Sequence, residues 1–195
     1  KGVRSFSAYY PYNANPTNDL IMFQVPDSAI QSKQKVNDFL FASGQASYAY
    51  PSLTLNFTHK MARVFIKIYP SPEYGFTTND FSGSILTFCD YFDSGTFNIK
   101  TGKVECSEES VSTGYFGEVK SSYMTFMLYV PAQTVPNIQL DLQNGEHYTF
   151  SINDKWEAGH SYSYSLKPVG SKLQITSVSI SSWESEQEQS IPGYI

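Results

Sequence analysis

Apolar residues recur at every second position along most of this chain, which is the pattern of strands with one buried face. The clearest example runs from Tyr123 to Val130, where the residues at even positions would share one side of a strand: Met124, Phe126, Leu128 and Val130. We therefore expect a core strand in this segment. No segment shows the period of three to four residues that an amphipathic helix requires.

A first hairpin is predicted between residues 138 and 152. Segments 138–142 and 148–152 each alternate apolar and polar residues, and Asn144-Gly145 lies between them. Because Asn-Gly favours positive φ at both central positions, the pair predicts a type I′ turn.

A second hairpin is predicted from segment 97–99, through a turn at Thr101-Gly102, to segment 104–106. We place Cys89 and Cys106 on paired segments of this region. Two cysteines occur in reduced and oxidised proteins alike, so a disulfide between them and two half-buried free thiols both stay open.

Two predicted strands change parity midway. Apolar residues occupy odd positions in 53–57 and even positions in 62–68, and segment 173–175 gives way to 178–180 in the same manner. An uninterrupted strand cannot send its apolar set to both faces. We therefore expect a break or bulge near His59-Lys60 and another inside the last strand.

Short strands separated by turns, without room for crossover helices, predict an all-β sandwich or barrel. The strongest interruption of the pattern is the Pro70–Gly75 segment. We place a domain boundary there, which gives an N-terminal β-sandwich domain at 1–72 and a C-terminal one at 73–183. The acidic tail 184–195 is expected to be a solvated extension.

Composition excludes several functional classes. The net charge of −5 is spread along 195 residues and the 13 basic residues form no cluster, so nucleic acid is not an expected partner. No apolar run approaches the roughly 20 residues of a membrane helix. We expect any export signal to lie outside these residues.

Candidate chemistry is sparse. The three histidines, His59, His147 and His160, have no partners at metal-ligand spacing, and the chain lacks nucleophile-elbow, phosphate-loop and zinc-protease motifs. We therefore expect no enzyme activity, no metal and no cofactor.

The aromatic content suggests one binding site. Tyr9, Tyr10 and Tyr12 form the densest local cluster, and exposed rings of this kind can stack on a glycan. The alternative is that these rings are structural, because tyrosine is common in strands with one buried and one wet face.

Four segments, in this order and spacing, resemble the fimbrillin family of pilus subunits of Gram-negative anaerobes. They are Phe6–Tyr12, Asp38–Ala42, Leu55–Val64, and Trp156–Tyr164 followed by Leu173–Trp183. The resemblance implies two tandem transthyretin-like β-sandwich domains and a structural or adhesive role in a surface fimbria. It also implies a precursor anchored in the outer membrane through a lipid alone, with other fimbrial subunits, and a surface receptor or glycan, as partners.

Assembly in that family is thought to follow proteolysis, after which a strand of one subunit fills a groove of the next. On this view Arg4 is a candidate protease site, the alternative being an ordinary surface charge. Ile191, Tyr194 and Ile195 are candidate anchors of a donor strand, although Pro192 would interrupt its backbone hydrogen bonds. A cell-surface carbohydrate-binding lipoprotein that never polymerises is the alternative function.

Overall fold

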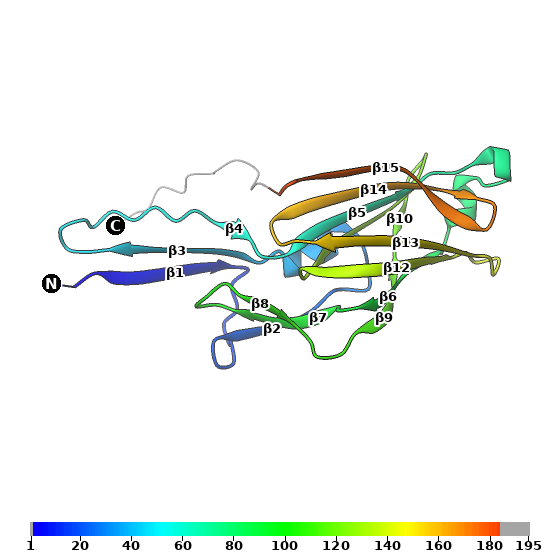
Figure 1. Ribbon diagram of the computed structural model, residues 1–195. Coiled ribbons are helices and arrows are strands. Elements are labelled where there is room, and N and C mark those ends of the chain that lie inside the picture. The colour runs from blue at the N-terminus through cyan, green and yellow to red at the C-terminus, as the bar shows by residue number, and fades with distance from the viewer. Residues whose placement is uncertain (1, 184–195) are drawn as a thin grey trace.

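Strands dominate the computed structural model, which describes residues 2–183 (Figure 1). The predicted all-β class is therefore confirmed. The strands are β1 (Arg4–Tyr10), β2 (Leu20–Gln24), β3 (Leu40–Ala46), β4 (Thr58–His59), β5 (Ala62–Ile68), β6 (Ile85–Tyr91), β7 (Ser94–Asn98), β8 (Val104–Cys106), β9 (Val111–Phe116), β10 (Glu118–Val119), β11 (Met124–Val130), β12 (Gln133–Asp141), β13 (His147–Trp156), β14 (His160–Val169) and β15 (Lys172–Ser182). The helices are short: α1 (Gln31–Gln34) and the 3-10 turns η1 (Lys35–Asn37), η2 (Pro72–Tyr74) and η3 (Thr78–Phe81).

The strands form one large and two small sheets. The large sheet has the order β10-β11-β5-β14-β15-β13-β12-β6-β9, and the small sheets have the orders β1-β3-β4 and β2-β7-β8. No helix among residues 2–183 is long and apolar enough to cross a membrane.

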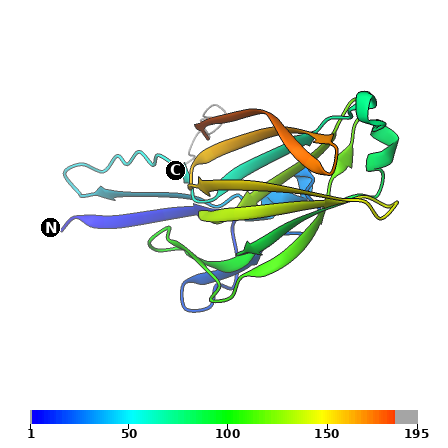
Figure 2. The same ribbon diagram turned by 45° about the vertical axis from the view of Figure 1, so that its right-hand side comes forward.

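The main core lies between two parts of the large sheet. Side chains of β5, β11 and β14 pack against those of β6, β12 and β13 in one buried cluster. Val64, Ile66, Leu86, Phe88 and Trp156 in this cluster are fully buried. The large sheet therefore folds over its own apolar face, as in a sandwich (Figure 2).

A second buried cluster lies on the other face of β11 and joins the three sheets. It combines residues that are far apart in the sequence: Ile21, Phe23, Phe39, Phe41, Met61, Phe97, Met127, Tyr129 and Trp183. Phe39 and Phe97 are stacked at its centre, with ring centroids 4.6 Å apart. Strand β11 is consequently buried on both faces, which explains its continuous apolar composition.

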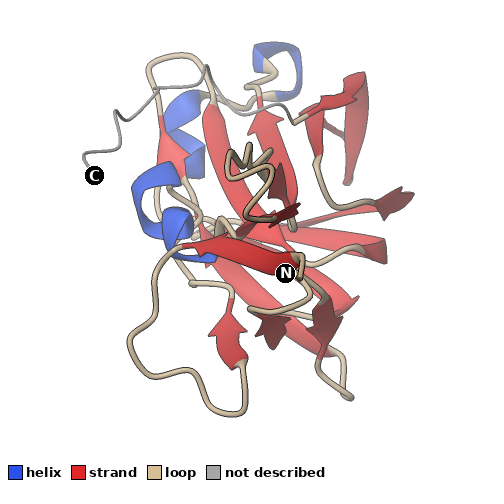
Figure 3. Ribbon diagram, turned by 90° about the vertical axis from the view of Figure 1, so that its left-hand side faces the viewer, coloured by secondary structure: helices blue, strands red, loops and turns tan. Residues whose placement is uncertain are grey.

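Strands β1 and β3 form an antiparallel ribbon that extends beyond the body of the molecule (Figure 1). Figure 3 views this ribbon from its free end. Strand β4 pairs with the base of β3, next to the start of β5.

Sheet pairing crosses the position at which the sequence predicts a domain boundary. Strand β5 precedes residue 72, yet it pairs with β11 on one side and runs parallel to β14 on the other. Both buried clusters also contain residues from each side of that position. The division into two transthyretin-like domains stays a prediction, and β5 belongs to the same sheet as the later strands.

The predicted hairpins are present, with one correction. Strands β12 and β13 pair as expected, and β7 and β8 pair around Gly102. The prediction of a type I′ turn is wrong. That turn requires a positive φ at both central residues, and only Gly145 of the Asn144-Gly145 pair has one, of 87°. The Gly145 N–H donates to the carbonyl of Leu142, so residues 142–145 form a β-turn that ends on a left-handed glycine.

Each of the two predicted parity changes coincides with an irregularity in the strands. The pairing of β14 with β15 shifts between Ser165 and Leu166, which leaves Thr176 as the extra residue of a bulge. The first change falls between β4 and β5, as predicted. The prediction of a strand at 53–57 is wrong. That segment runs beside β3 without forming a ladder, and the strand that does pair with β3 is β4, directly after it.

Candidate functional site

The projecting ribbon has one polar and one apolar face. Directly opposed residues of an antiparallel pair point to the same side. Phe6, Ala8 and Tyr10 therefore share a face with Gly44 and Ala42. The opposite face carries serine and glutamine at the free end of the ribbon: Ser5, Ser7, Ser43 and Gln45. A ribbon with an apolar face needs a covering layer or a further strand.

Only the β3 half of the apolar face is covered. A side-chain carbon at Gly44 would lie 2.5 Å from Leu53 Cδ1, so the returning segment 50–57 packs closely over β3 at this point. On β1, in contrast, Phe6 is 46% exposed and Tyr10 is 53% exposed.

Strand β1 also has an unpaired edge. Among residues 2–183 it pairs only with β3, so its second row of backbone N–H and C=O groups has no ladder partner there. We call this feature the β1 edge: the outer backbone edge of β1 together with Phe6, Ala8 and Tyr10. It offers a further strand both hydrogen bonds and apolar contacts.

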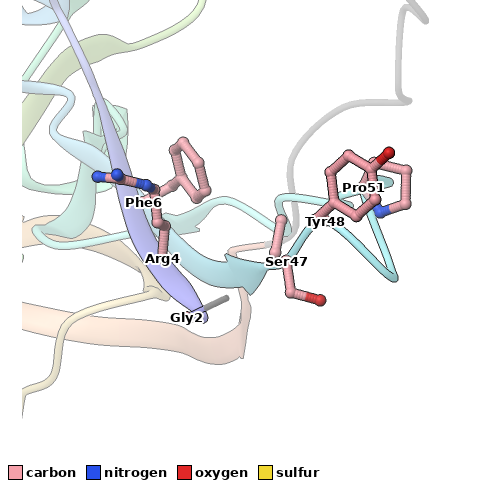
Figure 4. Close-up of a pocket in the computed structure, with 7 residues that line it drawn as sticks. Gly2, Arg4, Phe6, Ser47, Tyr48 and Pro51 are labelled. Atoms are coloured by element: carbon pink, nitrogen blue, oxygen red, sulfur yellow. The ribbon is translucent and has the colours of Figure 1, made fainter.

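A recess of about 490 Å³ lies at the free end of the ribbon (Figure 4). Figure 4 shows Arg4 and Phe6 reaching it from β1, and Tyr48 and Pro51 from the loop after β3. The recess is therefore continuous with the exposed apolar half of the ribbon.

The base of the ribbon is fixed by a group of side chains that the sequence reasoning missed. His59 Nδ1 lies 2.6 Å from the Asp38 carboxylate, and the His59 ring stacks on Trp183 with centroids 3.7 Å apart. The Arg63 guanidinium also lies over the Trp183 ring, 5.0 Å from its centroid. We call Asp38, His59, Arg63, Tyr129 and Trp183 the junction group.

The junction group links four distant parts of the chain: the residues just before β3, the β4–β5 region, strand β11 and the end of β15. Its residues line a recess of about 260 Å³. The available signal in the sequence was that Asp38, His59 and Trp183 all fall within the segments that carry the family resemblance.

The three candidate glycan-stacking tyrosines do not form one platform. Tyr9 packs on Phe97 and its hydroxyl donates to the carbonyl of Asn13, so it contributes to the fold. Tyr10 belongs to the β1 edge. Tyr12 is 80% exposed and borders a separate recess of about 290 Å³ that also contains Met22.

The remaining candidate residues are dispersed. Arg4 is the first residue of β1 and pairs with Ala46, so cleavage there would require the end of the ribbon to open. The donor-strand candidates Ile191, Tyr194 and Ile195 lie outside the described residues.

Of the two alternatives left open for the cysteines, the disulfide is not formed in this structure. Cys89 and Cys106 are free thiols, Cys89 in β6 of the large sheet and Cys106 in β8 of a small sheet. The predicted hairpin that contains Cys106 does not include Cys89. Burial raises the pKa of the Cys106 thiol above its ordinary value, which lowers its reactivity.

Two large buried side chains of the main core, Trp156 and Tyr164, are joined by a hydrogen bond. Trp156 Nε1 donates to the Tyr164 hydroxyl over 3.0 Å, and that hydroxyl donates to the Asp154 carboxylate over 2.8 Å. Burial and the hydrogen bond to Asp154 raise the pKa of Tyr164 well above its ordinary value. Within residues 2–183, no three His, Cys, Asp or Glu side chains are grouped to hold a metal ion.

Comparison with solved structures identifies the same fold in candidate cell adhesion proteins and in a fimbrial protein. A candidate cell adhesion protein from Bacteroides uniformis matches with a TM-score of 0.73 at 19% identity, over 93% of this chain and 73% of that chain. Another from Bacteroides ovatus matches with a TM-score of 0.69 at 24% identity, over 96% and 71%. The tip fimbrial protein Mfa3 from Porphyromonas gingivalis matches with a TM-score of 0.51 at 11% identity, over 85% and 70%.

No curated protein sequence matches this chain. The sequence model of the fimbrillin-like family, however, matches residues 2–183, which include every strand described above. The chain therefore belongs to the fimbrillin-like family.

Proposed function

We propose that this protein is a structural or adhesive subunit of a cell-surface fimbria and that it joins other subunits by strand complementation. Its membership of the fimbrillin-like family and the fimbrial tip protein among its structural relatives support the fimbrial role. The β1 edge is the observation that supports complementation, because it combines an unpaired backbone with exposed apolar side chains.

The receiving site in this proposal is the outer side of β1. An added strand would complete the ladder of β1 and place alternate side chains over Phe6, Ala8 and Tyr10. The residues of β1 that follow Arg4 would then gain a second partner strand along their length. The part of the recess lined by Phe6 and Pro51, which remains after cleavage at Arg4, would accept a larger side chain at the free end.

The donating segment in this proposal is the tail 184–195 of a neighbouring subunit, with Ile191, Tyr194 and Ile195 as anchors. The tail follows Trp183, which is held in the junction group at the base of the ribbon. Trp183, the residue before the tail, is thus fixed on each subunit. Removal of a preceding segment by cleavage at Arg4 would expose the β1 edge in the precursor.

The test uses the full-length precursor and two lysine variants on adjacent residues of β1. Phe6→Lys places a charge on the apolar face, and Ser7→Lys places the same charge on the polar face. After treatment with an arginine-specific protease, we expect wild type and Ser7→Lys to form detergent-resistant multimers on unboiled gels and filaments in negative stain. We expect Phe6→Lys to form neither detergent-resistant multimers nor filaments.

Persistent monomer in the wild type would contradict the proposal, and so would filaments of Phe6→Lys as abundant as those of Ser7→Lys. Anchoring of the precursor in the outer membrane through a lipid belongs to the same proposal. It is tested by metabolic labelling of the precursor with a radioactive fatty acid, followed by cell fractionation.

A second candidate function is a cell-surface carbohydrate-binding protein that does not polymerise. The exposed ring of Tyr12 beside its recess favours this alternative. It predicts glycan binding by monomeric protein that is lost in Tyr12→Ala and kept in Tyr9→Phe, because Tyr9 is packed against Phe97. Glycan-array binding of the three proteins separates the two functions.

A further inference from the structure

Strand β15 carries an apolar row that points inward but remains exposed. Its partners on β14 belong to the main core and are at most 3% exposed. Opposed residues of an antiparallel pair share a face, so the β15 residues of these pairs also point toward the core side. The pairs are Tyr162 with Ile180, Tyr164 with Val178, and Leu166 with Ile175. Nevertheless Ile175 is 39%, Val178 43% and Ile180 56% exposed.

The outer backbone edge of β15 is almost unpaired. Beyond its ladder with β14, its only partner among residues 2–183 is Thr149 of β13, opposite Lys172 at its first position. From Leu173 to Ser182 the outer edge has no ladder partner in the described part of the chain. Because the apolar row borders that edge, both features lie on the same side of the molecule.

Apart from the bulge at Thr176, this edge lacks the usual protection against pairing with another strand. Exposed edges are commonly blunted by charges, proline or very short length. The β10 edge of the same sheet is two residues long and carries Glu118, which forms an ion pair with Lys120. Segment 173–182, in contrast, has no charged residue, no proline and no glycine.

We propose that β15 pairs with β15 of a second copy of this chain in an antiparallel, two-fold symmetric arrangement centred on Ser179. The sequence supports this particular partner because Ser177–Ser181 reads Ser-Val-Ser-Ile-Ser. Around a central Ser179, Val178 lies opposite Ile180 of the second copy, and serine lies opposite serine. The apolar rows of the two copies thus continue into each other on one face.

Two-fold symmetry makes this interface self-complementary, since each copy contributes the same surface. The interface uses β15 alone and leaves the β1 edge free. It is therefore independent of the proposed strand complementation. A negative result in the experiments on one edge does not refute the proposal for the other edge.

The first test measures the oligomeric state of the full chain by light scattering over a range of concentrations. Val178→Lys is compared with Val111→Lys, which places the same charge on β9, a terminal strand of the large sheet, at similar exposure (43% and 39%). We expect wild type and Val111→Lys to dimerise with the same affinity. The Kd of Val178→Lys should rise about tenfold or more.

The second test uses disulfide trapping in a background in which Cys89 and Cys106 are replaced by serine. Opposed side chains in an antiparallel pair have Cβ atoms about 5 Å apart, so Ser179→Cys should give a covalent dimer under mild oxidation. Ser112→Cys on β9 should not. Wild type that stays monomeric at every concentration, dimerisation unaffected by Val178→Lys, or equal trapping by both cysteines would each overturn the proposal.

Discussion

The junction group gives the sharpest prediction on stability, through replacement of Trp183 by alanine. The indole is 7% exposed and contacts three side chains: the His59 ring at 3.7 Å, the Tyr129 ring at 4.8 Å and the Arg63 guanidinium at 5.0 Å. Truncation removes these contacts together and leaves a cavity between the base of the ribbon and the end of β15.

The expected cost is about 3 kcal/mol, at the lower end of values for buried tryptophan because the group lies at the periphery of the core. For a chain of this size, each kcal/mol lowers Tm by about 2–4 °C, so Trp183→Ala should melt roughly 6–12 °C below wild type. The stacked pair of His59 and Trp183 should account for about 1 kcal/mol of coupling.

The assay is urea unfolding of wild type, Trp183→Ala, His59→Ala and the double variant, which form a double-mutant cycle. Tyr12→Ala serves as the control, since the 80% exposed Tyr12 side chain should change the free energy of unfolding by less than about 0.5 kcal/mol. Hydrogen exchange of the Lys60 amide, which donates to the Phe39 carbonyl, reports on the base of the ribbon. A loss below about 1 kcal/mol in Trp183→Ala, with no coupling to His59, would refute this role of the junction group.

Two further predictions concern the stability of the fold. Gly95→Ala should destabilise the protein by about 2 kcal/mol in urea unfolding, because a side-chain carbon at Gly95 would overlap the Glu105 carbonyl of the paired strand, whereas Gly2→Ala has nothing within 4 Å and should be neutral. Stability should also fall as pH rises above about 10, where tyrosines of the unfolded chain begin to lose their protons. Burial, followed by the hydrogen bond to Glu146, raises the pKa of Tyr148 to about 12, so the folded state keeps its proton longer. Unfolding free energy measured from pH 9 to 12 should decline with pH in wild type and decline less in Tyr148→Phe, and an equal slope in both would contradict the assignment.

Local patterns predicted the features of the fold that depend on neighbours in the sequence. Alternation fixes which residues share a face, so β11 and the two hairpins were predictable, and the parity change at 173–180 revealed the bulge at Thr176. The turn at Asn144-Gly145 was assigned to the wrong type because a type I turn followed by a left-handed glycine uses the same two residues.

These local patterns could not predict which segments pair when they lie far apart in the sequence. Alternation in 53–57 predicted a strand, but the segment has no ladder partner among the described residues and is not a strand. The parallel pairing of β5 with β14 joins positions about a hundred residues apart, which no local period encodes. For the same reason the stacking of His59 on Trp183 could not be predicted, although both residues lie in the segments that carry the family resemblance.

The two open edges place different demands on a fimbrial subunit. The β1 edge lies on a ribbon that projects beyond the body, and its proposed occupant comes from a different part of the chain, so contacts of this kind join head to tail and extend into a filament. The β15 edge is self-complementary and closes after two copies. Phe6→Lys should therefore abolish filaments and leave the dimer of free subunits unchanged. Val178→Lys should abolish that dimer and leave filament length unchanged, and any variant that removes both assemblies would show that the two edges depend on each other.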